Sequence, residues 1–349
     1  MRRLPEPPIA AALLMPAWLG DAVMASALVA PLAALSGGPV QLWCRPAQRA
    51  LFAGQPQVAE ILDYDPSGRH RGPAGWGRLR REVKASAHAP RALWLVPDSF
   101  SAAWSAAVAG VPARVGFAGQ GRDLLLSHRL AGPRDRQTHW IDGRAGLLAP
   151  FMSGPASGWQ PGLTVSGQAR ARLEARLAAL GVAPARAIVL VPGATFGPAK
   201  RWPGFAELGR LLPADFALVI AGAASERELG GELARALAQP GRPIVDLCGA
   251  LDLGELAALL SLARCTVSND TGPMHLAAAV GGRVLGLFLS TVPAWTAPRG
   301  PAARWLAAAV PCRPCFARDC PLPAQVCGEA ISPKAVRAAI ADWLAPEPT

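Results

Sequence analysis

Residues 187–203 decide the fold, and they read A-I-V-L-V-P-G-A-T-F-G-P-A-K-R-W-P. A short apolar run ends at a proline and a glycine, and an amphipathic segment follows at 203–212. This pattern is typical of a buried parallel strand that leads through a loop into a helix. The loop carries Lys200, one of only three lysines among 35 basic residues. We therefore expect Lys200 to serve where a compact ammonium charge is needed.

The same alternation of short apolar runs and amphipathic segments continues through the chain. Strands are predicted at 9–15, 40–43, 58–62, 92–97, 187–192, 217–222, 245–248, 265–268 and 284–289. Helices are predicted near 22–35, 76–84, 101–109, 203–212, 225–238, 252–263 and 273–280. Strands that alternate with helices indicate an α/β protein with parallel sheets and right-handed crossovers.

A segment rich in Gly, Pro and Ser at 151–167 separates the two halves, and its composition is typical of a linker. We predict two α/β domains, 1–152 and 168–330, joined by a linker at 153–167 and followed by a C-terminal helix within 331–349. A chain of 349 residues is long enough to form two domains. Ligands of such sheets bind outside the carboxyl ends of the strands, so the loops that leave those ends are the candidate sites.

The composition excludes a disordered chain, because 51% of residues are hydrophobic and 17% are charged. The net charge of +11 favours an anionic partner, such as a nucleotide-bearing substrate or an anionic membrane face. The arginines are scattered apart from Arg78, Arg80 and Arg81, so no nucleic-acid partner is predicted. The N-terminus imitates a signal peptide, but prolines and Asp21 interrupt it. We read it as a first strand and helix, and the protein as cytoplasmic.

Two of the predicted loops carry polar groups that suit a nucleotide substrate. In P-A-W-L-G-D at 16–21, Asp21 lies at or near the start of a helix. It is either a cap or a general base that the helix N-terminus keeps ionised. In the loop at 193–200, Lys200 and the Thr195 hydroxyl are either solvated or bind phosphate oxygens.

A third loop, S-N-D-T-G-P-M-H-L-A-A-A at 268–279, runs from a strand into a helix that begins near Pro273. A helix start of this kind presents free N–H groups and a positive dipole end, which bind anions. The alternative is that Asp270 or Thr271 only caps the helix. His275 is read as a core or capping residue and not as a metal ligand. The chain shows no phosphate-binding glycine motif and no hydrolase signature.

Four stretches spread over both halves resemble the ADP-heptose:lipopolysaccharide heptosyltransferase family, glycosyltransferase family 9, and its type II members most. They are P-A-W-L-G-D-A-V-M-A-S-A-L (16–28), V-P-D-S-F-S-A-A-W (96–104), P-G-A-T-F-G-P-A-K-R-W-P (192–203) and N-D-T-G-P-M-H-L-A-A-A (269–279). The resemblance implies the GT-B fold, in which two Rossmann-like domains face each other across a cleft that holds the active site. It also implies an inverting transfer of heptose from ADP-L-glycero-D-manno-heptose to the lipopolysaccharide inner core, with no cofactor or metal required for catalysis.

The resemblance also implies roles for individual residues. Asp21 falls on the family's proposed catalytic base, and Lys200 on the residue that contacts the donor phosphates. The implied donor-binding residues are Lys200, Glu226, Asp270, Thr271, Gly272, Met274 and His275. We add Thr195 to them, because its hydroxyl suits a phosphate oxygen. The implied acceptor is lipid A that carries Kdo or heptose, which would place the protein at the cytoplasmic face of the inner membrane as a peripheral protein. The alternatives are a transferase of the same fold that uses another nucleotide sugar or a protein acceptor, a nucleotide-sugar epimerase, and a non-catalytic lipid-binding module.

Four of the seven cysteines fall within the segment 312–327, with the spacing C-x₂-C-x₄-C-x₆-C. In a cytosolic protein, Cys312, Cys315, Cys320 and Cys327 suggest a structural zinc or iron site formed by four thiolates. Free thiols or disulfides are the alternative. The other three cysteines stand singly in apolar surroundings and are expected in the core.

Overall fold

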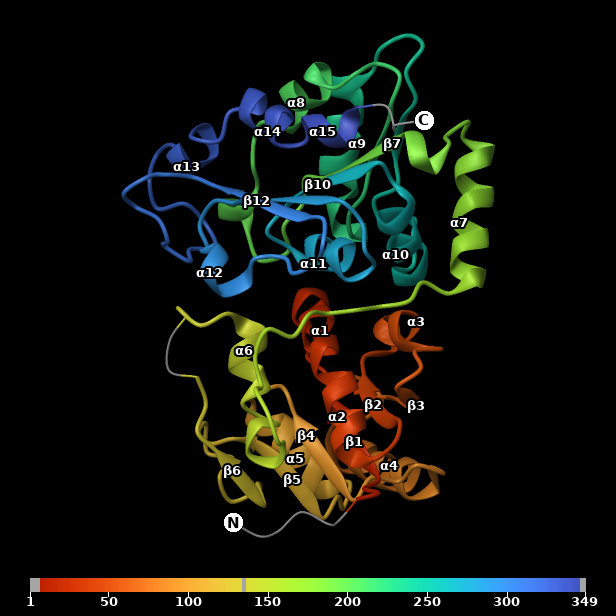
Figure 1. Ribbon diagram of the computed structural model, residues 1–349, viewed down its shortest axis with the longest axis vertical. Helices are drawn as coiled ribbons and strands as arrows, with labels where there is room; N and C mark the ends of the chain where they lie inside the picture. Colours follow the sequence, from red (N-terminus) through yellow and green to blue (C-terminus); the bar gives the residue numbers. More distant parts are fainter. Residues whose placement is uncertain (1–6, 134–135, 346–349) are drawn as a thin grey trace. The chain divides into compact units, whose positions relative to one another are not determined.

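The chain folds as two units, Met1–Thr164 and Val165–Thr349, with the boundary inside the segment predicted as a linker. The structure is a computed structural model that describes residues 7–133 and 136–345 (Figure 1). Each unit contains one parallel six-stranded sheet with helices packed on it. This confirms the prediction of an α/β chain with two Rossmann-like sheets.

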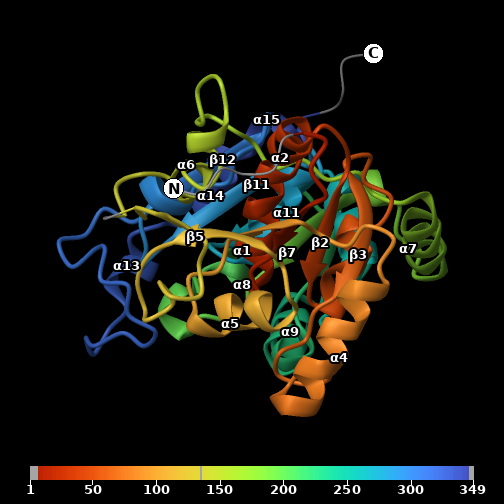
Figure 2. The same cartoon turned by 90° about the horizontal axis from the view of Figure 1, so that it is seen from below.

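Unit 1 has the strand order β3-β2-β1-β4-β5-β6. The strands are β1 (Ala11–Leu14), β2 (Val40–Cys44), β3 (Val58–Asp63), β4 (Ala92–Leu95), β5 (Ala113–Phe117) and β6 (His128–Leu130). The helices are α1 (Leu19–Ala25), α2 (Val29–Ser36), α3 (Arg49–Phe52), α4 (Gly72–Ala85), α5 (Phe100–Val108) and α6 (Trp140–Ala145). Helices α4 and α5 pack on the same face of the sheet, where their apolar residues join one buried cluster (Figure 2).

Unit 2 repeats this topology in the order β12-β11-β10-β7-β8-β9. The strands are β7 (Ala187–Val191), β8 (Ala217–Ile220), β9 (Ile244–Asp246), β10 (Cys265–Asn269), β11 (Val284–Phe288) and β12 (Ala303–Ala307). The helices are α7 (Gly167–Ala179), α8 (Phe205–Leu211), α9 (Arg227–Leu237), α10 (Leu253–Leu262), α11 (Gly272–Ala279), α12 (Pro293–Thr296), α13 (Val326–Glu329), α14 (Pro333–Ala339) and α15 (Ala341–Leu344).

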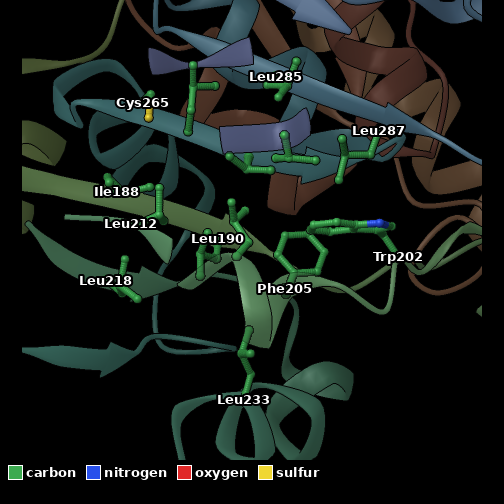
Figure 3. Packing of buried hydrophobic residues seen from close by; sticks show 14 of the residues in the cluster. Ile188, Leu190, Trp202, Phe205, Leu212, Leu218, Leu233, Cys265, Leu285 and Leu287 are labelled. Atoms are coloured by element: carbon green, nitrogen blue, oxygen red, sulfur yellow. The ribbon is translucent and has the colours of Figure 1, made fainter. Parts of the chain in front are cut away.

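The core of unit 2 explains why its central strands read as unbroken apolar runs. Ile188 and Leu190 of β7 point to the same face as Leu285 and Leu287 of β11, and Trp202 and Phe205 pack on that face (Figure 3). The opposite sides of β7, β10 and β11 are also buried. Burial on both faces favours near-continuous apolar runs, which is the pattern at 187–191, whereas β10 also buries three polar side chains.

The strand order fixes where each unit can bind a ligand. In unit 1 the order reverses between β1 and β4, and in unit 2 it reverses between β7 and β10. Each of these positions is a topological switch point. The connections that follow the two strands run in opposite directions there, which opens a crevice at the carboxyl ends of the strands. The loops after β1 and β4, and those after β7 and β10, are therefore the expected site loops.

The helix predicted at 22–35 is not continuous. Helix α1 ends at Ala25, a 3₁₀ turn covers Ser26–Leu28, and α2 begins at Val29. Pro31 explains the break, because it lacks the N–H that would bond the carbonyl of Ala27 and its ring would collide with that carbonyl. The stretch Leu19–Ser36 is long and apolar enough to cross a membrane by length and composition, but 56% of it is buried in the structure.

Candidate functional site

Lys200 lies in the loop that leaves β7, at the end of a 3₁₀ turn, Pro198–Lys200. Its ammonium donates to Oδ2 of Asp270 at 2.6 Å and to the Asp270 carbonyl at 3.1 Å. It also lies 5.2 Å from the ring centroid of Phe196, within range of a cation–π contact. Only 14% of the Lys200 side chain and 4% of the Asp270 side chain are exposed. The β7 loop and the β10 loop thus hold one ammonium group at the switch point.

Asp270, which immediately follows β10, accepts a hydrogen bond from a second side chain besides Lys200. Its Oδ2 also accepts a hydrogen bond from Thr291 Oγ1 at 2.6 Å. With Lys200 and Thr291 on this one oxygen and the residue almost fully buried, Asp270 is placed to orient the lysine. The sequence suggested that Asp270 contacts the nucleotide-sugar donor. In the structure its carboxylate binds Lys200 and Thr291. Thr291 was not predicted, because nothing in its sequence surroundings marks it.

Asn269 fixes both ends of the loop from 192 to 202 that carries Lys200, which we call the lysine loop. The sequence assigned Asn269 no role. Its side-chain amide donates to the carbonyl of Pro192 at 2.8 Å and of Gly193 at 3.3 Å. Its Oδ1 accepts the backbone N–H of Trp202 at 3.0 Å. The residue is fully buried, so these bonds are not exchanged with water. A strand-end asparagine therefore closes the loop from 192 to 202 into one defined shape.

Glu226 reaches the same edge of the sheet. It ends the 3₁₀ turn Ala224–Glu226, and its Oε2 accepts the N–H of Ala223 at 2.8 Å. A Cβ added to Gly193 would lie 2.0 Å from Glu226 Oε1, and one added to Gly222 would lie 2.8 Å from Oε2. The carboxylate therefore lies against the start of the lysine loop, and a side chain at position 193 would displace it from there.

The other residues predicted to bind the nucleotide-sugar donor differ in how deeply they are buried. Thr195 is exposed in the lysine loop, and Thr271 and Gly272 are half-buried at the start of α11. Thr271 is the N-cap of α11, although its side chain makes no capping bond. Met274 and His275 are buried, and the Met274 sulfur packs against Gly286 of β11. Met274 therefore holds α11 on the sheet, and its side chain is not available to a ligand in this structure.

The cysteine-containing segment 312–327 packs directly on the lysine loop. The carbonyl of Arg318 accepts the N–H of Ala199 at 2.9 Å, and the side-chain amide of Gln325 donates to the Ala199 carbonyl at 2.9 Å. A Cβ on Gly197 would lie 2.4 Å from the Arg318 carbonyl oxygen, so the two backbones touch where only glycine fits. The segment thus braces the residue next to Lys200, a role that the sequence did not reveal.

The four thiols of this segment differ in their exposure. Burial raises the pKa of Cys327, and negative charge on Cys320, Cys312 and Cys315 would raise this pKa further. Cys312 and Cys315 are exposed, whereas Cys327 is buried. Among the described residues, no group of three or more His, Cys, Asp or Glu side chains is arranged to hold a metal ion.

The seven cysteines should react very differently with a thiol reagent. Burial raises the pKa of both Cys44 and Cys265 to about 12, and it also raises the pKa of Cys248. The thiolate is the reactive form. We expect iodoacetamide at pH 8 to label Cys312 and Cys315 in the folded protein after metal has been removed with chelator, and to spare Cys44, Cys248 and Cys265, as read by peptide mass analysis. Equal labelling of Cys265 without denaturant would contradict this burial.

Asp21 lies in the first turn of α1, directly after the loop that leaves β1. Trp18 is the N-cap, so Asp21 is the third residue of the helix and not its cap. Trp18 is 63% exposed, while the following turns of α1 are buried. Asp21 is half-buried and thus stands at the carboxyl edge of the unit 1 sheet, as the sequence predicted.

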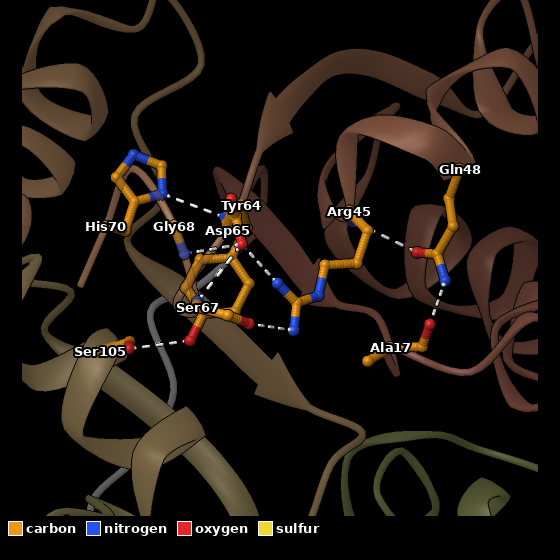
Figure 4. Close-up of polar contacts among 9 residues, drawn as sticks. All are labelled: Ala17, Arg45, Gln48, Tyr64, Asp65, Ser67, Gly68, His70 and Ser105. Atoms are coloured by element: carbon orange, nitrogen blue, oxygen red, sulfur yellow. Dashed lines mark hydrogen bonds and ion pairs between the residues drawn. The ribbon is translucent and has the colours of Figure 1, made fainter.

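A pocket of about 130 Å³ opens at the switch point of unit 1. Its walls come from the ends of β1, β2, β3 and β4 and from the first turn of α5: Leu14, Met15, Ala17, Arg45, Tyr64, Pro66, Pro97, Ser99, Ser101 and Ala102. The guanidinium of Arg45 donates to Asp65 Oδ1 at 2.5 Å and to Ser67 Oγ at 2.9 Å (Figure 4). The lining of this pocket is thus largely apolar, with one anchored cationic side chain and three residues that carry hydroxyl groups.

A pair of arginines holds the β4 loop that forms one wall of this pocket. Arg122, which is 1% exposed, donates to Asp98 Oδ1 at 2.9 Å and to the Pro97 carbonyl at 2.6 Å. Arg144 approaches Asp98 Oδ2 at 2.7 Å. Burial lowers the pKa of Arg122, and the charge of Asp98 opposes that shift. The loop 97–99 is therefore anchored by ion pairs.

Comparison with known proteins agrees with this geometry. Residues 76–325 match the family profile of glycosyltransferase family 9 (heptosyltransferase). Lipopolysaccharide heptosyltransferase 2 of Salmonella typhimurium is 28% identical over 310 residues, which cover 83% of this chain and 85% of that protein. The solved structure of E. coli ADP-heptose lps heptosyltransferase II superposes with a TM-score of 0.77 at 24% identity, covering 96% of this chain and 98% of that one.

A second solved structure, E. coli heptosyltransferase WaaC with ADP, superposes with a TM-score of 0.70 at 17% identity and covers 95% of this chain and 99% of that one. The family profile spans well over half of the chain. With its two Rossmann-like sheets, the protein has the GT-B fold, and it belongs to glycosyltransferase family 9, the heptosyltransferases.

Proposed function

We propose that this enzyme transfers heptose from ADP-L-glycero-D-manno-heptose to the inner core of lipopolysaccharide, with inversion at the anomeric carbon, as a heptosyltransferase of type II. The observation that carries the proposal is the buried Lys200–Asp270 pair at the switch point of unit 2. The names of the curated relatives supply the donor and acceptor class.

The donor half of the proposed mechanism rests on Lys200. As the bond between the anomeric carbon and the ADP oxygen breaks, negative charge grows on the diphosphate. Asp270 holds the Lys200 ammonium with two of its three N–H groups, which leaves one N–H for a phosphate oxygen. A positioned cation in a partly desolvated site stabilises such charge without reorganising during the reaction. Thr195, Thr271 and Gly272 would complete the phosphate contacts, and Glu226 would accept hydrogen bonds from the ribose hydroxyls.

The acceptor half rests on Asp21. Its carboxylate would take the proton from the attacking acceptor hydroxyl while that oxygen forms a bond to the anomeric carbon. The electron pair of the broken bond leaves with ADP, and attack from the opposite face inverts the configuration. The unit 1 pocket beside the same sheet edge would hold the acceptor sugar.

The test is incubation of the purified protein with ADP-heptose and candidate inner-core acceptors, followed by mass analysis of the products. We expect acceptor-dependent addition of one heptose and release of ADP. Conversion of the sugar nucleotide without acceptor would instead identify an epimerase. Transfer only from another nucleotide sugar, or only to protein, would contradict the proposed donor or acceptor.

Gly197→Ala tests whether the cysteine segment positions the lysine loop. The added Cβ would collide with the Arg318 carbonyl and push Ala199 and Lys200 out of place. Overpacking of this kind costs on the order of 1–3 kcal/mol, so we expect ADP affinity to fall by roughly fivefold to a hundredfold in calorimetric titration. Gly167→Ala is the matched control, because nothing lies within 4 Å of its Cβ position. Unchanged ADP affinity in Gly197→Ala would refute the bracing role.

We also propose that Cys312, Cys315, Cys320 and Cys327 bind a structural zinc or iron ion. Support comes from the chemistry and spacing of four thiols in one short segment. The present arrangement of the thiols does not itself form such a site, so binding would have to draw them together. Metal analysis after anaerobic purification tests the proposal, and a metal-free protein with unaltered stability in chelator would refute it.

The lipid-linked acceptor implies a location. We propose that the enzyme works in the cytoplasm and attaches peripherally to the anionic inner membrane. The net charge of +11 supports this attachment.

A further inference from the structure

Helices α4 and α5 carry a surface that the proposed chemistry does not use; we call it the aromatic–cationic face. Trp76 of α4 meets Trp104 of α5 edge-on, with ring centroids 5.4 Å apart, and Phe100 stacks on Trp104 at 6.3 Å. Phe100 is 47% exposed and Trp104 is 36% exposed. Large aromatic side chains that gather at a surface mark an interaction site more often than scattered ones do.

Cationic side chains continue this surface along α4. Arg78, Arg80, Arg81 and Lys84 are all exposed, and among residues 7–133 and 136–345 none of the four forms an ion pair with a carboxylate. The single acidic residue of α4, Glu82, is occupied by Arg69 and His70.

The spacing places aromatic and cationic groups side by side. Trp76, Arg80 and Lys84 recur every four residues, so they form one stripe along α4. Phe100 and Trp104 have the same spacing on α5. The stripe on α4 and the stripe on α5 meet where Trp76 touches Trp104.

We propose that the aromatic–cationic face docks unit 1 on a bilayer that contains anionic phospholipid. Tryptophan and other amphipathic rings favour the headgroup depth of a membrane, and Arg and Lys beside them interact with anionic lipid. A protein partner would need carboxylates matched to four flexible side chains. A bilayer needs only negative charge density and room for the rings, which fits an exposed patch without carboxylate partners.

The position of this face next to the unit 1 pocket gives the docking a purpose. Ser99, Ser101 and Ala102, at the start of α5, line the pocket, and Phe100 in the same turn is exposed on the docking face. A lipid-linked acceptor could place its sugar in the pocket while its acyl chains stay in the bilayer. The docking specifies a surface for the membrane attachment proposed above, and this last step rests also on the proposed transferase activity.

Flotation of the full chain with phospholipid vesicles tests the inference. We expect binding to vesicles of phosphatidylcholine mixed with phosphatidylglycerol, weak binding to phosphatidylcholine alone, and release by salt. The double variant Arg80→Glu/Lys84→Glu should lower the partition coefficient more than about tenfold, since each basic residue contributes to attraction. Phe100→Ser/Trp104→Ser should lower it as well. Trp305→Ser, which changes a 51% exposed tryptophan on β12, and Arg235→Glu on α9 are the matched controls.

The outcomes separate docking from catalysis. Absence of wild-type binding to anionic vesicles, or wild-type binding by both double variants, would overturn the inference. The charge-reversal variant keeps the aromatic cluster, so its result stands even if the aromatic variant unfolds in a thermal melt. We expect it to retain transfer to a lipid-free acceptor fragment but to lose transfer to a bilayer-embedded acceptor. A wild-type protein that binds vesicles but transfers nothing would refute the proposed function alone.

Discussion

Lys200→Met is expected to lower kcat for heptose transfer by roughly a hundredfold, which is about 3 kcal/mol of transition-state stabilisation. Methionine keeps the length of the side chain but removes the charge that faces the departing diphosphate. Asp270 then keeps a buried carboxylate without its ammonium partner, so thermal unfolding must be measured alongside turnover.

Lys334→Met is the matched control for this change. Lys334 is exposed on the first turn of α14 in the same unit and forms no ion pair with a carboxylate in the described part of the chain. The expected result is normal turnover for Lys334→Met and a folded, nearly inactive Lys200→Met. Near-normal kcat in a folded Lys200→Met protein would remove this lysine from the mechanism.

Asp21→Asn is expected to lower kcat by about a hundredfold to ten-thousandfold, the range typical of a lost general base. The amide has nearly the same shape but cannot accept the proton of the acceptor hydroxyl. ADP affinity should stay close to that of the wild type, because the donor contacts proposed above come from unit 2. Steady-state kinetics with calorimetric titration of ADP therefore separates the two effects.

Asp63→Asn is a suitable control in unit 1. Asp63 ends β3 and forms an ion pair with Arg49 at 2.8 Å, partly exposed to solvent. Such surface pairs contribute little, about 0–1 kcal/mol, so stability and turnover should change little. If Asp21→Asn turned over as fast as Asp63→Asn, the assignment of the base would be wrong.

The sequence predicted nine of the twelve strands in the described part of the chain and missed β5, β6 and β12. The runs that became β1 and β7 are apolar throughout because helices cover both faces of each sheet. β6 is only three residues long, and β12 is partly exposed with an arginine and a tryptophan, so neither has this signature. Both lie at a sheet edge, which has one open side and tolerates polar residues.

The sequence also located the site loops but not the residues that support them. Lys200 and Asp270 stood out by residue type and by resemblance. Thr291 and Arg318 act on the lysine loop through contacts with residues distant in sequence. Contacts of that kind depend on how β11 and the cysteine segment fold back, which no local pattern encodes. Asp21 was placed near a helix start correctly, but the exposed Trp18 precedes the helix as its cap.

The central claim is that Lys200, held by Asp270, binds the diphosphate of the donor. Calorimetric titration of ADP and AMP into the wild type and Lys200→Met, with EDTA present, tests it most directly. The second phosphate should make ADP bind more tightly than AMP by about ten- to a hundredfold in the wild type, the range expected for a charged hydrogen bond. Lys200→Met should lose most of that difference while AMP binding stays the same. An ADP preference that survives in Lys200→Met would contradict the account.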